Sequence, residues 1–281
     1  MTDDNSGMTR EEAAGLGIFI MPMPFFINGE LTYQSETFTR KDFYNKLAEG
    51  ADVSTSQPSP GDVMDMWNDI LSKGYDEIVY IPMSSGLSAS CSTAMGLARD
   101  YDGKVQVVDN QRISVTMQQS VMDAKHLVAA GKSAAQIKEI LEKEALESSI
   151  YLMVDTLKYL KKGGRISKTT AFAGGILNIK PVLTIQDGEV VVIGKARGSK
   201  QGNNLLVEKI HNSGGIDFSM PILLGYSGLS DVFLKKYVED SRALWQEGTD
   251  TLDSTLLCSV IGTHTGPGVV AVAFFKKSSA R

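Results

Sequence analysis

The segment EIVYIPMSSGLSAS, residues 77–90, joins an apolar run to a loop of small and hydroxyl-bearing residues. Its apolar part ends at a proline and has the length of a buried strand, and a helix is predicted from about Leu87 to residues 102–103. The same order follows again, because residues 104–109 (KVQVVD) predict a strand and residues 114–130 predict a helix. Strands that alternate with helices form βαβ units, so this part of the chain predicts a parallel sheet.

Flanking segments extend this pattern through the N-terminal half. Asn28-Gly29 interrupts an apolar run and predicts a β-hairpin, because this dipeptide readily adopts two positive φ angles. Apolar positions at helical spacing over residues 62–71 predict a helix. The segment IYLMVD, residues 150–155, predicts the last strand of this half. We therefore assign residues 1–155 to an N-terminal α/β domain with a parallel sheet.

The C-terminal half has a different character. Asp187-Gly188 lies between two β-branched runs and is a strong hairpin signal. The segments at residues 221–228 and 256–275 supply three more strand candidates, one of them LLCSVI. Residues 156–281 therefore predict a mixed α/β domain with antiparallel hairpins, and the whole chain predicts an α/β protein of two domains.

Composition narrows the class of protein. The chain has 281 residues, 42% of them hydrophobic, and a net charge of −5, which argues against a nucleic-acid partner. Two cysteines fit a reducing cytoplasm and offer no metal-ligand spacing. The polar N-terminus is unlike a signal peptide, and no apolar stretch approaches the roughly 20 residues that span a bilayer. The first residues read like the end of a strand, so either the first strand is very short or native residues precede it.

The serine loop predicts an anion site. Ligands tend to bind beyond the carboxyl ends of parallel strands, and helix N-termini present unpaired N–H groups. Ser84, Ser85 and Ser88 add hydroxyl donors, and Gly86 allows close approach of the backbone. The alternative is that one serine caps the following helix and the others are ordinary loop residues.

Other segments carry further candidates. Thr55 and Ser56 lie in a second hydroxyl-rich loop, TSQPS, where N-capping is the competing explanation. His264 lies in the glycine-rich segment GTHTGPG, where the ring is suited to donate to a carboxylate or a phosphate. Arg165 follows Gly163-Gly164, a helix C-terminus signal, so a turn directs its side chain.

Together these segments resemble the DegV family, which includes the fatty-acid-binding FakB proteins. The resemblance covers nearly the whole chain and follows the family's order. It rests on TDDNSGM (2–8), TSQPSPGD (55–62), SSGLSAS (84–90), LKYLKKGGRIS (157–167), ILNIKPVLTIQDGEV (176–190) and THTGPGVVAV (263–272).

The resemblance implies a long-chain fatty acid buried in a tunnel between the two domains. Its carboxylate is expected at Thr55, Ser84, Ser85 and His264, with Ser56, Gly86, Arg165 and Thr265 as neighbouring contacts. No cofactor, metal or catalytic group is implied, so the chain is expected to be a carrier and not an enzyme.

The family also implies partners. In bacteria, a separate ATP-dependent fatty acid kinase subunit converts the bound acid to an acyl phosphate for phospholipid metabolism. Arg197 and Lys200, which follow the second hairpin, are the expected kinase contacts, and transient contact with a membrane surface is expected as well.

Two departures from the family pattern concern the acyl tunnel. Ser88-Ala89-Ser90 stands where the family often has Ser-Gly-Thr, and Ser114-Val115-Thr116-Met117-Gln118 stands where it often has Ser-x-Gly-x-Gly. Added bulk at these positions changes the tunnel shape and therefore the preferred chain length.

Two other functions remain open from the residues alone. One is a hydrolase or phosphotransferase that uses Ser85 or Ser88 with His264 as base, although no third triad member is evident. The other is a structural or regulatory protein whose lipid only fills space.

Overall fold

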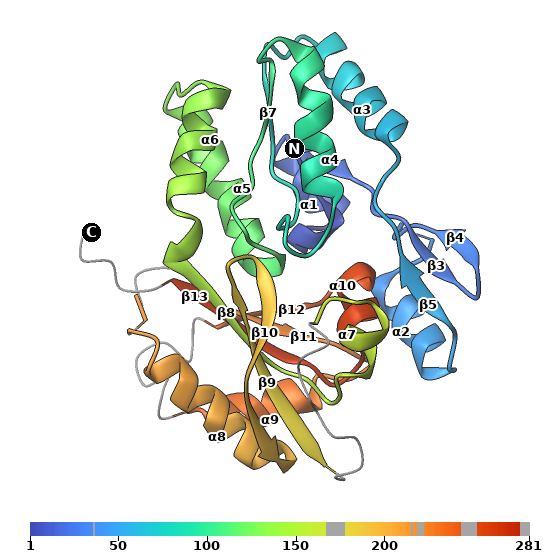
Figure 1. Ribbon diagram of the computed structural model, residues 1–281, viewed down its shortest axis with the longest axis vertical. Helices are drawn as coiled ribbons and strands as arrows, with labels where there is room; N and C mark the ends of the chain where they lie inside the picture. The colour runs from blue at the N-terminus through green and yellow to red at the C-terminus, as the bar shows by residue number, and fades with distance from the viewer. Residues whose placement is uncertain (36, 167–177, 215, 218–221, 243–251, 276–281) are drawn as a thin grey trace.

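A computed structural model describes residues 1–35, 37–166, 178–214, 216–217, 222–242 and 252–275 (Figure 1). Four short parallel strands organise the N-terminal half: β1 (Thr2–Asp3), β2 (Ile20–Met21), β6 (Ile78–Tyr80) and β7 (Val105–Val107). A parallel bridge from Thr2 to Ile81 joins the two pairs and gives the order β2-β1-β6-β7. The predicted parallel sheet is therefore confirmed, with a first strand of only two residues.

Helices surround these strands, and a small antiparallel sheet lies to one side. The helical elements are η1 (Asp4–Ser6), α1 (Arg10–Gly15), α2 (Arg40–Ala48), α3 (Pro60–Ser72), α4 (Ser90–Leu97), η2 (Ala98–Tyr101), α5 (Ser114–Ala129), α6 (Ala134–Lys143) and η3 (Ala145–Glu147). The small sheet has the order β4-β3-β5, formed by β3 (Phe25–Ile27), β4 (Glu30–Thr32) and β5 (Val53–Thr55). Asn28 and Gly29 join β3 to β4 with φ angles of 51° and 86°, so the predicted hairpin is confirmed.

A six-stranded sheet forms the second half, in the order β10-β9-β8-β13-β11-β12. Its strands are β8 (Ser148–Met153), β9 (Ile179–Gln186), β10 (Glu189–Arg197), β11 (Leu223–Tyr226), β12 (Asp253–Leu256) and β13 (Val270–Phe275). The helices are α7 (Lys158–Lys162), α8 (Gly198–His211), α9 (Val232–Asp240) and α10 (Ser259–Thr265). All pairs are antiparallel except β11–β12, and Asp187-Gly188 joins β9 to β10 as predicted.

The strand at residues 150–155 belongs to a different sheet from the one predicted. β8 pairs antiparallel with β9 on one side and with β13 on the other, and Tyr151 stacks on Phe274 with ring centroids 5.8 Å apart. The N-terminal strands are two or three residues long, so they offer too little edge to pair with a six-residue strand. A division into domains at residue 155 stays a prediction.

The segment LLCSVI was also misassigned. β12 ends at Leu256, and Ser259–Thr265 forms α10, so His264 lies in the last turn of a helix and not in a loop. Thr263 and Thr265 donate to the carbonyls of Ser259 and Ile261, at 2.9 and 3.0 Å, and Gly266 ends the helix at φ 73°. Periodicity does not separate a strand from a helix in so short an apolar run.

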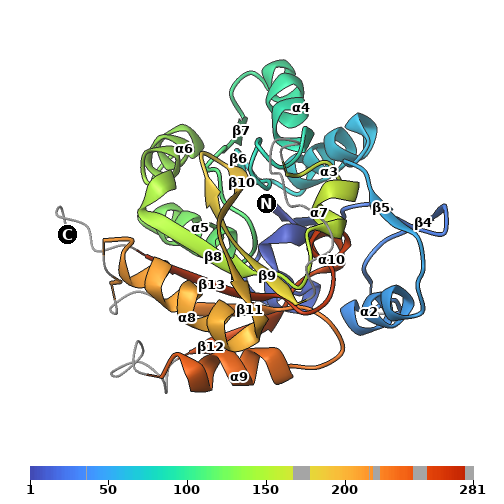
Figure 2. The same ribbon diagram turned by 60° about the horizontal axis from the view of Figure 1, so that its bottom comes forward.

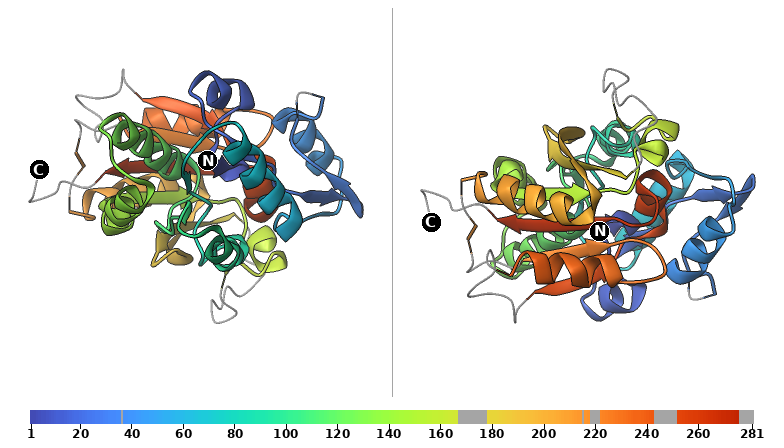
Figure 3. Two further views of the ribbon diagram at one scale, coloured as in Figure 1. Left: turned by 90° about the horizontal axis from the view of Figure 1, so that it is seen from above. Right: turned by 90° about the horizontal axis from the view of Figure 1, so that it is seen from below.

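The two faces of the six-stranded sheet differ in what covers them. Helices α8 and α9 cover one face, as the lower part of Figure 1 and both views of Figure 3 show. The N-terminal half lies over the other face, with α5 in contact with β8 and β13 (Figure 2). Along β13, Val270, Val272 and Phe274 pack with the α8–α9 side, while Ala271 and Ala273 face the N-terminal half. Small side chains on that face leave space between the halves.

Within the described parts of the chain, no helix combines the length and the apolar character needed to cross a bilayer.

The β9–β10 turn of the second half packs against the serine loop of the first. A Cβ atom on Gly86 would lie 2.7 Å from the carbonyl oxygen of Gly188. The Ser84 hydroxyl donates to that same oxygen at 2.9 Å. Gly86 therefore permits close approach of protein backbone at this point.

This contact predicts the effect of Gly86→Ala. The added methyl group overpacks the junction and is expected to lower the free energy of unfolding by roughly 1–3 kcal/mol, measured by urea denaturation. Gly96→Ala is the control, since Gly96 lies in α4 with open space around it. That change is expected to raise stability by about 0.5–1 kcal/mol. Equal effects of the two substitutions would contradict the close contact.

Candidate functional site

A cavity lies between the six-stranded sheet and the N-terminal half. It encloses about 840 Å³ of empty space, counting the part that is open to solvent. Its apolar lining comes from Met23, Met83, Leu87, Ile113, Ile150, Leu152, Leu160, Ile185, Val190, Leu257, Val260, Ile261 and Ala271. Its polar lining comes from Asn5, Thr55, Ser56, Ser88, Ser114, Arg165, His264 and Thr265. The cavity is thus mostly hydrocarbon, with a limited set of polar groups.

Thr55 and His264 meet at the polar part of this cavity. Thr55 ends β5 and His264 lies in α10, and Thr55 Oγ1 is 2.8 Å from His264 Nε2. The His264 ring lies directly over Gly163, where a Cβ atom would collide with Nδ1. His264 Nδ1 is buried and has no hydrogen-bond partner among the described residues. Nε2 is therefore held by Thr55, Nδ1 packs against the Gly163 backbone, and the ring lines the cavity between these two contacts.

Arg165 lies beside this histidine. Its Nε donates to the carbonyl of Leu87 at 3.1 Å and its Nη1 donates to the carbonyl of Gly163 at 2.5 Å. Burial, and then the Arg165 charge, lower the pKa of His264 to about 4. The imidazole is therefore neutral at neutral pH, and a negative ligand next to it would offset both causes.

Ser56 and Thr265, which the family resemblance names as contacts of the ligand, also line the cavity, and their contact with a ligand stays a prediction. Thr265 Oγ1 donates to the carbonyl of Ile261 at 3.0 Å, so its hydroxyl keeps lone pairs for further contacts. Ser56 is held by its N–H, which donates to the carbonyl of Pro24 at 3.2 Å. The structure thus brings Thr55, His264 and Arg165 together with these two residues at one cavity.

The serine loop is placed differently. Ser84 is buried, and its hydroxyl donates to Gly188 and not into the cavity. Ser85 and Gly86 are exposed, and the N–H of Ser85 donates to Asp109 Oδ1 at 3.2 Å. None of the three lines the cavity, whereas Leu87 and Ser88 do. Their contact with a ligand stays a prediction.

The capping alternatives apply to one of these loops. The N-cap of α4 is Ala89, without a side-chain cap, and Ser88 Oγ only accepts from the N–H of Ser90 at 3.2 Å. Ser59 is the N-cap of α3 and accepts from the N–H of Asp62. Thr55 does not cap a helix, and its hydroxyl faces His264.

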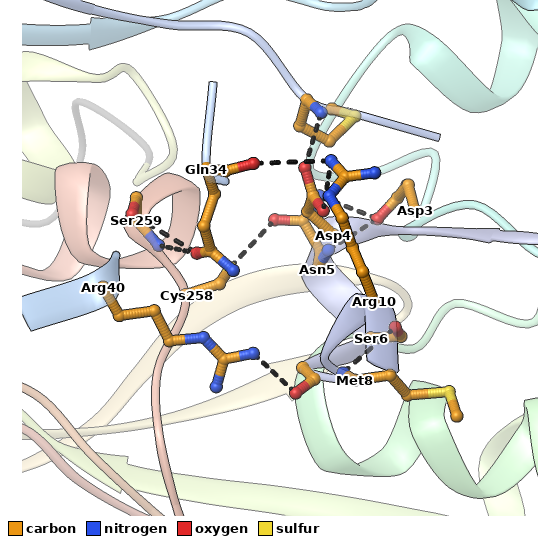
Figure 4. A network of polar contacts seen from close by, with 12 residues as sticks. Asp3, Asp4, Asn5, Ser6, Met8, Arg10, Gln34, Arg40, Cys258 and Ser259 are labelled. Atoms are coloured by element: carbon orange, nitrogen blue, oxygen red, sulfur yellow. Dashed lines mark hydrogen bonds and ion pairs between the residues drawn. The ribbon is translucent and has the colours of Figure 1, made fainter. Parts of the chain in front are cut away.

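Asn5 lines the cavity and was not predicted from the sequence. Asp3 Oδ1 accepts from the N–H and the Nδ2 of Asn5, at 2.8 and 2.9 Å, and Cys258 Sγ lies 3.7 Å from Asn5 Oδ1 (Figure 4). Asp3 Oδ2 accepts from the N–H of Met83, which fixes the start of the serine loop. Because η1, which contains Asn5, follows β1 directly, the rule that ligands bind beyond parallel strands would have found Asn5.

The same network joins the two halves of the chain. Arg40 of α2 donates to the carbonyls of Gly7 and Leu256, both at 2.7 Å, and Gln34 Oε1 accepts from Ser259 (Figure 4). Burial raises the pKa of Asp3 to about 6, although its hydrogen bonds lower it. The network holds α10, and therefore His264, against the N-terminal residues.

The expected kinase contacts lie on the surface. Arg197 ends β10 and Lys200 lies in the first turn of α8, and both side chains are exposed. In the described part of the chain, no group of His, Cys, Asp and Glu residues is arranged to hold a metal ion.

Comparison with known proteins agrees with this architecture. The family model described as "Uncharacterised protein, DegV family" matches residues 1–277. The chain belongs to the DegV family. A DegV domain-containing protein of Caldanaerobacter subterraneus is 30% identical over 282 residues, covering 99% of this chain and 98% of its own.

Two solved structures of DegV proteins share the fold. One, a DegV family protein from Thermus thermophilus described by its fatty acid binding, has 28% identity and a TM-score of 0.83 over 98% of both chains. The other, DegV from Bacillus subtilis, described as a fatty acid binding protein, has 25% identity and a TM-score of 0.80 over 98% of both chains. Fatty acid binding is therefore a property of solved DegV family members.

The buried imidazole predicts a specific titration. In lipid-free protein, the pKa of His264 is expected far below its ordinary value of 6.5, near 4. A bound carboxylate should raise it, because a neighbouring anion favours the imidazolium. The measurement is an NMR titration of the three histidines, with His264→Gln to assign the signal. An unperturbed pKa in the lipid-free protein would contradict the geometry.

The same shift affects stability in a defined direction. The unfolded chain takes up a proton near pH 6.5, before the folded protein does, so His264 costs stability as pH falls from 6.5 toward 4. Between pH 7 and pH 5, wild type should lose on the order of 1–2 kcal/mol more than His264→Gln. The difference between the two proteins removes the contribution of Asp3, whose raised pKa acts in the opposite sense.

Proposed function

We propose that this chain binds a long-chain fatty acid in the cavity, with the carboxylate at Thr55 and His264 and the hydrocarbon against the apolar lining. The observation that carries the proposal is one cavity with a mostly apolar wall and a polar end where Thr55, His264 and Arg165 meet. The fatty acid binding described for the Thermus thermophilus and Bacillus subtilis proteins supports it.

The hydrocarbon contributes most of the binding free energy. Burial of a methylene group contributes about 0.8 kcal/mol, so a chain of roughly 16 carbons gains on the order of 10 kcal/mol before ordering costs. This gain requires a dry apolar wall, which β8, β9 and β13 supply through Ile150, Ile185 and Ala271.

The headgroup requires hydrogen bonds, because an unpaired buried carboxylate is costly. When His264 Nε2 carries the ring proton, it donates to Thr55 Oγ1 and leaves the Thr55 hydroxyl free to donate to the carboxylate. Arg165 supplies positive charge next to this pair. Ser56, Thr265 and Asn5 line the same cavity. Ser84, Ser85 and Gly86 remain candidate contacts through the family resemblance and through their position beside Leu87 and Ser88.

We further propose that the chain is a carrier and that a separate ATP-dependent kinase phosphorylates the bound acid. In the described residues, His264 Nε2 pairs with Thr55 and Nδ1 has no hydrogen-bond partner, so the ring is bonded neither to a carboxylate nor to the hydroxyl of Ser85 or Ser88. This arrangement is unlike a Ser-His hydrolase. Arg197 and Lys200 provide an exposed positive segment for docking an acidic kinase surface.

The headgroup contacts predict graded losses of affinity. Thr55→Val removes a hydroxyl next to a buried carboxylate and should weaken fatty-acid binding by roughly 1–3 kcal/mol, about 5- to 150-fold. His264→Gln keeps a donor and should lose less than His264→Ala. Titration of delipidated protein measures the affinities, and an ester-hydrolysis assay is run on the same samples. If the wild-type protein hydrolyses the ester and both His264 variants do not, the protein is an enzyme and the carrier proposal is overturned.

The docking segment predicts a separate effect. Arg197→Glu combined with Lys200→Glu should leave fatty-acid affinity intact and slow phosphorylation by the cognate kinase at least tenfold, roughly 1.4 kcal/mol. Lys125→Glu with Lys132→Glu is the matched control, because both lysines are exposed on the other half of the chain. Normal phosphorylation in the first variant, or equal slowing in the control, would place the docking surface elsewhere.

A further inference from the structure

A second pocket lies next to the main cavity. It encloses about 330 Å³ of empty space, counting the part open to solvent. Ile113, Ile150 and Ile185 line both spaces, so these three side chains separate one from the other. They are called the isoleucine partition here, and the space behind them is called the rear chamber.

The partition lies at the end of the cavity away from His264. On β8, Leu152 and Ile150 point to the same face, and only Ile150 also lines the rear chamber. The C-terminal end of β8 leads to α7, and α7 packs on α10, which carries His264. Because a strand rises about 3.3 Å per residue, Ile150 lies about 7 Å farther from His264 along β8 than Leu152 does. An acyl chain anchored at His264 would therefore have its distal end at the partition.

The rear chamber differs chemically from the main cavity. Gln111 lines it, and Gln111 Oε1 is buried without a hydrogen-bond partner among the described residues. The exposed Asp187 of the β9–β10 turn lines it as well. The Thr116 hydroxyl already donates to the carbonyl of Ile113, and the Arg112 guanidinium donates to Ser120 Oγ and to the carbonyls of Glu144 and Ala145. Gln111 Oε1 is therefore the acceptor in this chamber that still needs a donor.

Gln111 and Asp187 discriminate between chain ends. A methyl end would leave the Gln111 oxygen unpaired, which is unfavourable. A second carboxylate would be repelled by Asp187. A hydroxyl is neutral and donates one hydrogen bond, so it matches the buried amide oxygen.

We propose that the isoleucine partition sets the length limit for unsubstituted acyl chains, and that the rear chamber binds the terminal hydroxyl of longer, ω-hydroxylated fatty acids. This inference rests on the proposed function, because it assumes a carboxylate anchored at His264. A longer chain passes the partition by turning the isoleucine side chains aside, and the hydrogen bond to Gln111 offsets that cost only when the chain end is a hydroxyl.

The experiment measures dissociation constants for saturated acids of about 12 to about 22 carbons and for their ω-hydroxy counterparts, on delipidated protein. Affinity of wild type for the plain acids should rise by about fourfold per added methylene up to a limit and then stop rising. Beyond that limit the ω-hydroxy acids should bind at least tenfold more tightly than plain acids of equal length. Gln111→Met should reduce that ratio toward one.

A matched pair of variants tests the partition. Ile150→Ala and Leu152→Ala shorten side chains on one face of β8, each 7% exposed in the structure. Ile150→Ala should move the length limit upward by about two carbons, whereas Leu152→Ala should weaken all lengths alike and leave the limit in place. Ile113→Ala, on a different segment, repeats the test if Ile150→Ala does not fold.

The possible outcomes distinguish failure of this inference from failure of the proposed fatty-acid binding. An unchanged limit in both Ile150→Ala and Ile113→Ala, or equal binding of plain and ω-hydroxy acids beyond the limit, overturns the inference while fatty-acid binding stands. Absence of any binding by wild type across the whole series overturns the proposed function itself.

Discussion

The hydrogen bond between Thr55 Oγ1 and His264 Nε2 closes the polar end of the cavity across two halves of the chain that are 209 residues apart in sequence. It is formed because α10 is held against the N-terminal residues by Arg40, Gln34 and Asn5. Gly163 leaves the room that the imidazole ring occupies. His264 and Arg165 then line the cavity together with Thr55, so the polar end exists only when both halves are in place.

The space in the rest of the cavity depends on where the large and the small side chains of β13 point. β13 alternates large residues toward α8 and α9 with Ala271 and Ala273 toward the N-terminal half. The outer face is closely packed, and the inner face leaves space for a ligand. The alternation of large and small side chains along β13, together with the hydrogen bonds at the polar end, therefore accounts for the cavity.

Local chemistry determined which features were predictable from the sequence. Asn28-Gly29 and Asp187-Gly188 were found because their turns depend on residues next to each other. The sheet to which β8 belongs, and the helical form of Ser259–Thr265, depend on pairing partners far along the chain, so local patterns misassigned them. The family resemblance named Thr55 and His264, which meet in the structure. The turning of Ser84 toward Gly188 was not predicted, because it depends on packing between the halves. Asn5 was overlooked although it follows a parallel strand, in the position where ligand contacts are expected.

Mass spectrometry of the purified protein, intact and after denaturation, decides whether the cavity holds a fatty acid. One long-chain fatty acid is expected for each chain in the native protein, released on denaturation, and absent or depleted in His264→Ala. A native protein that carries no fatty acid, and that takes none up when delipidated protein is offered the free acid, would contradict this expectation.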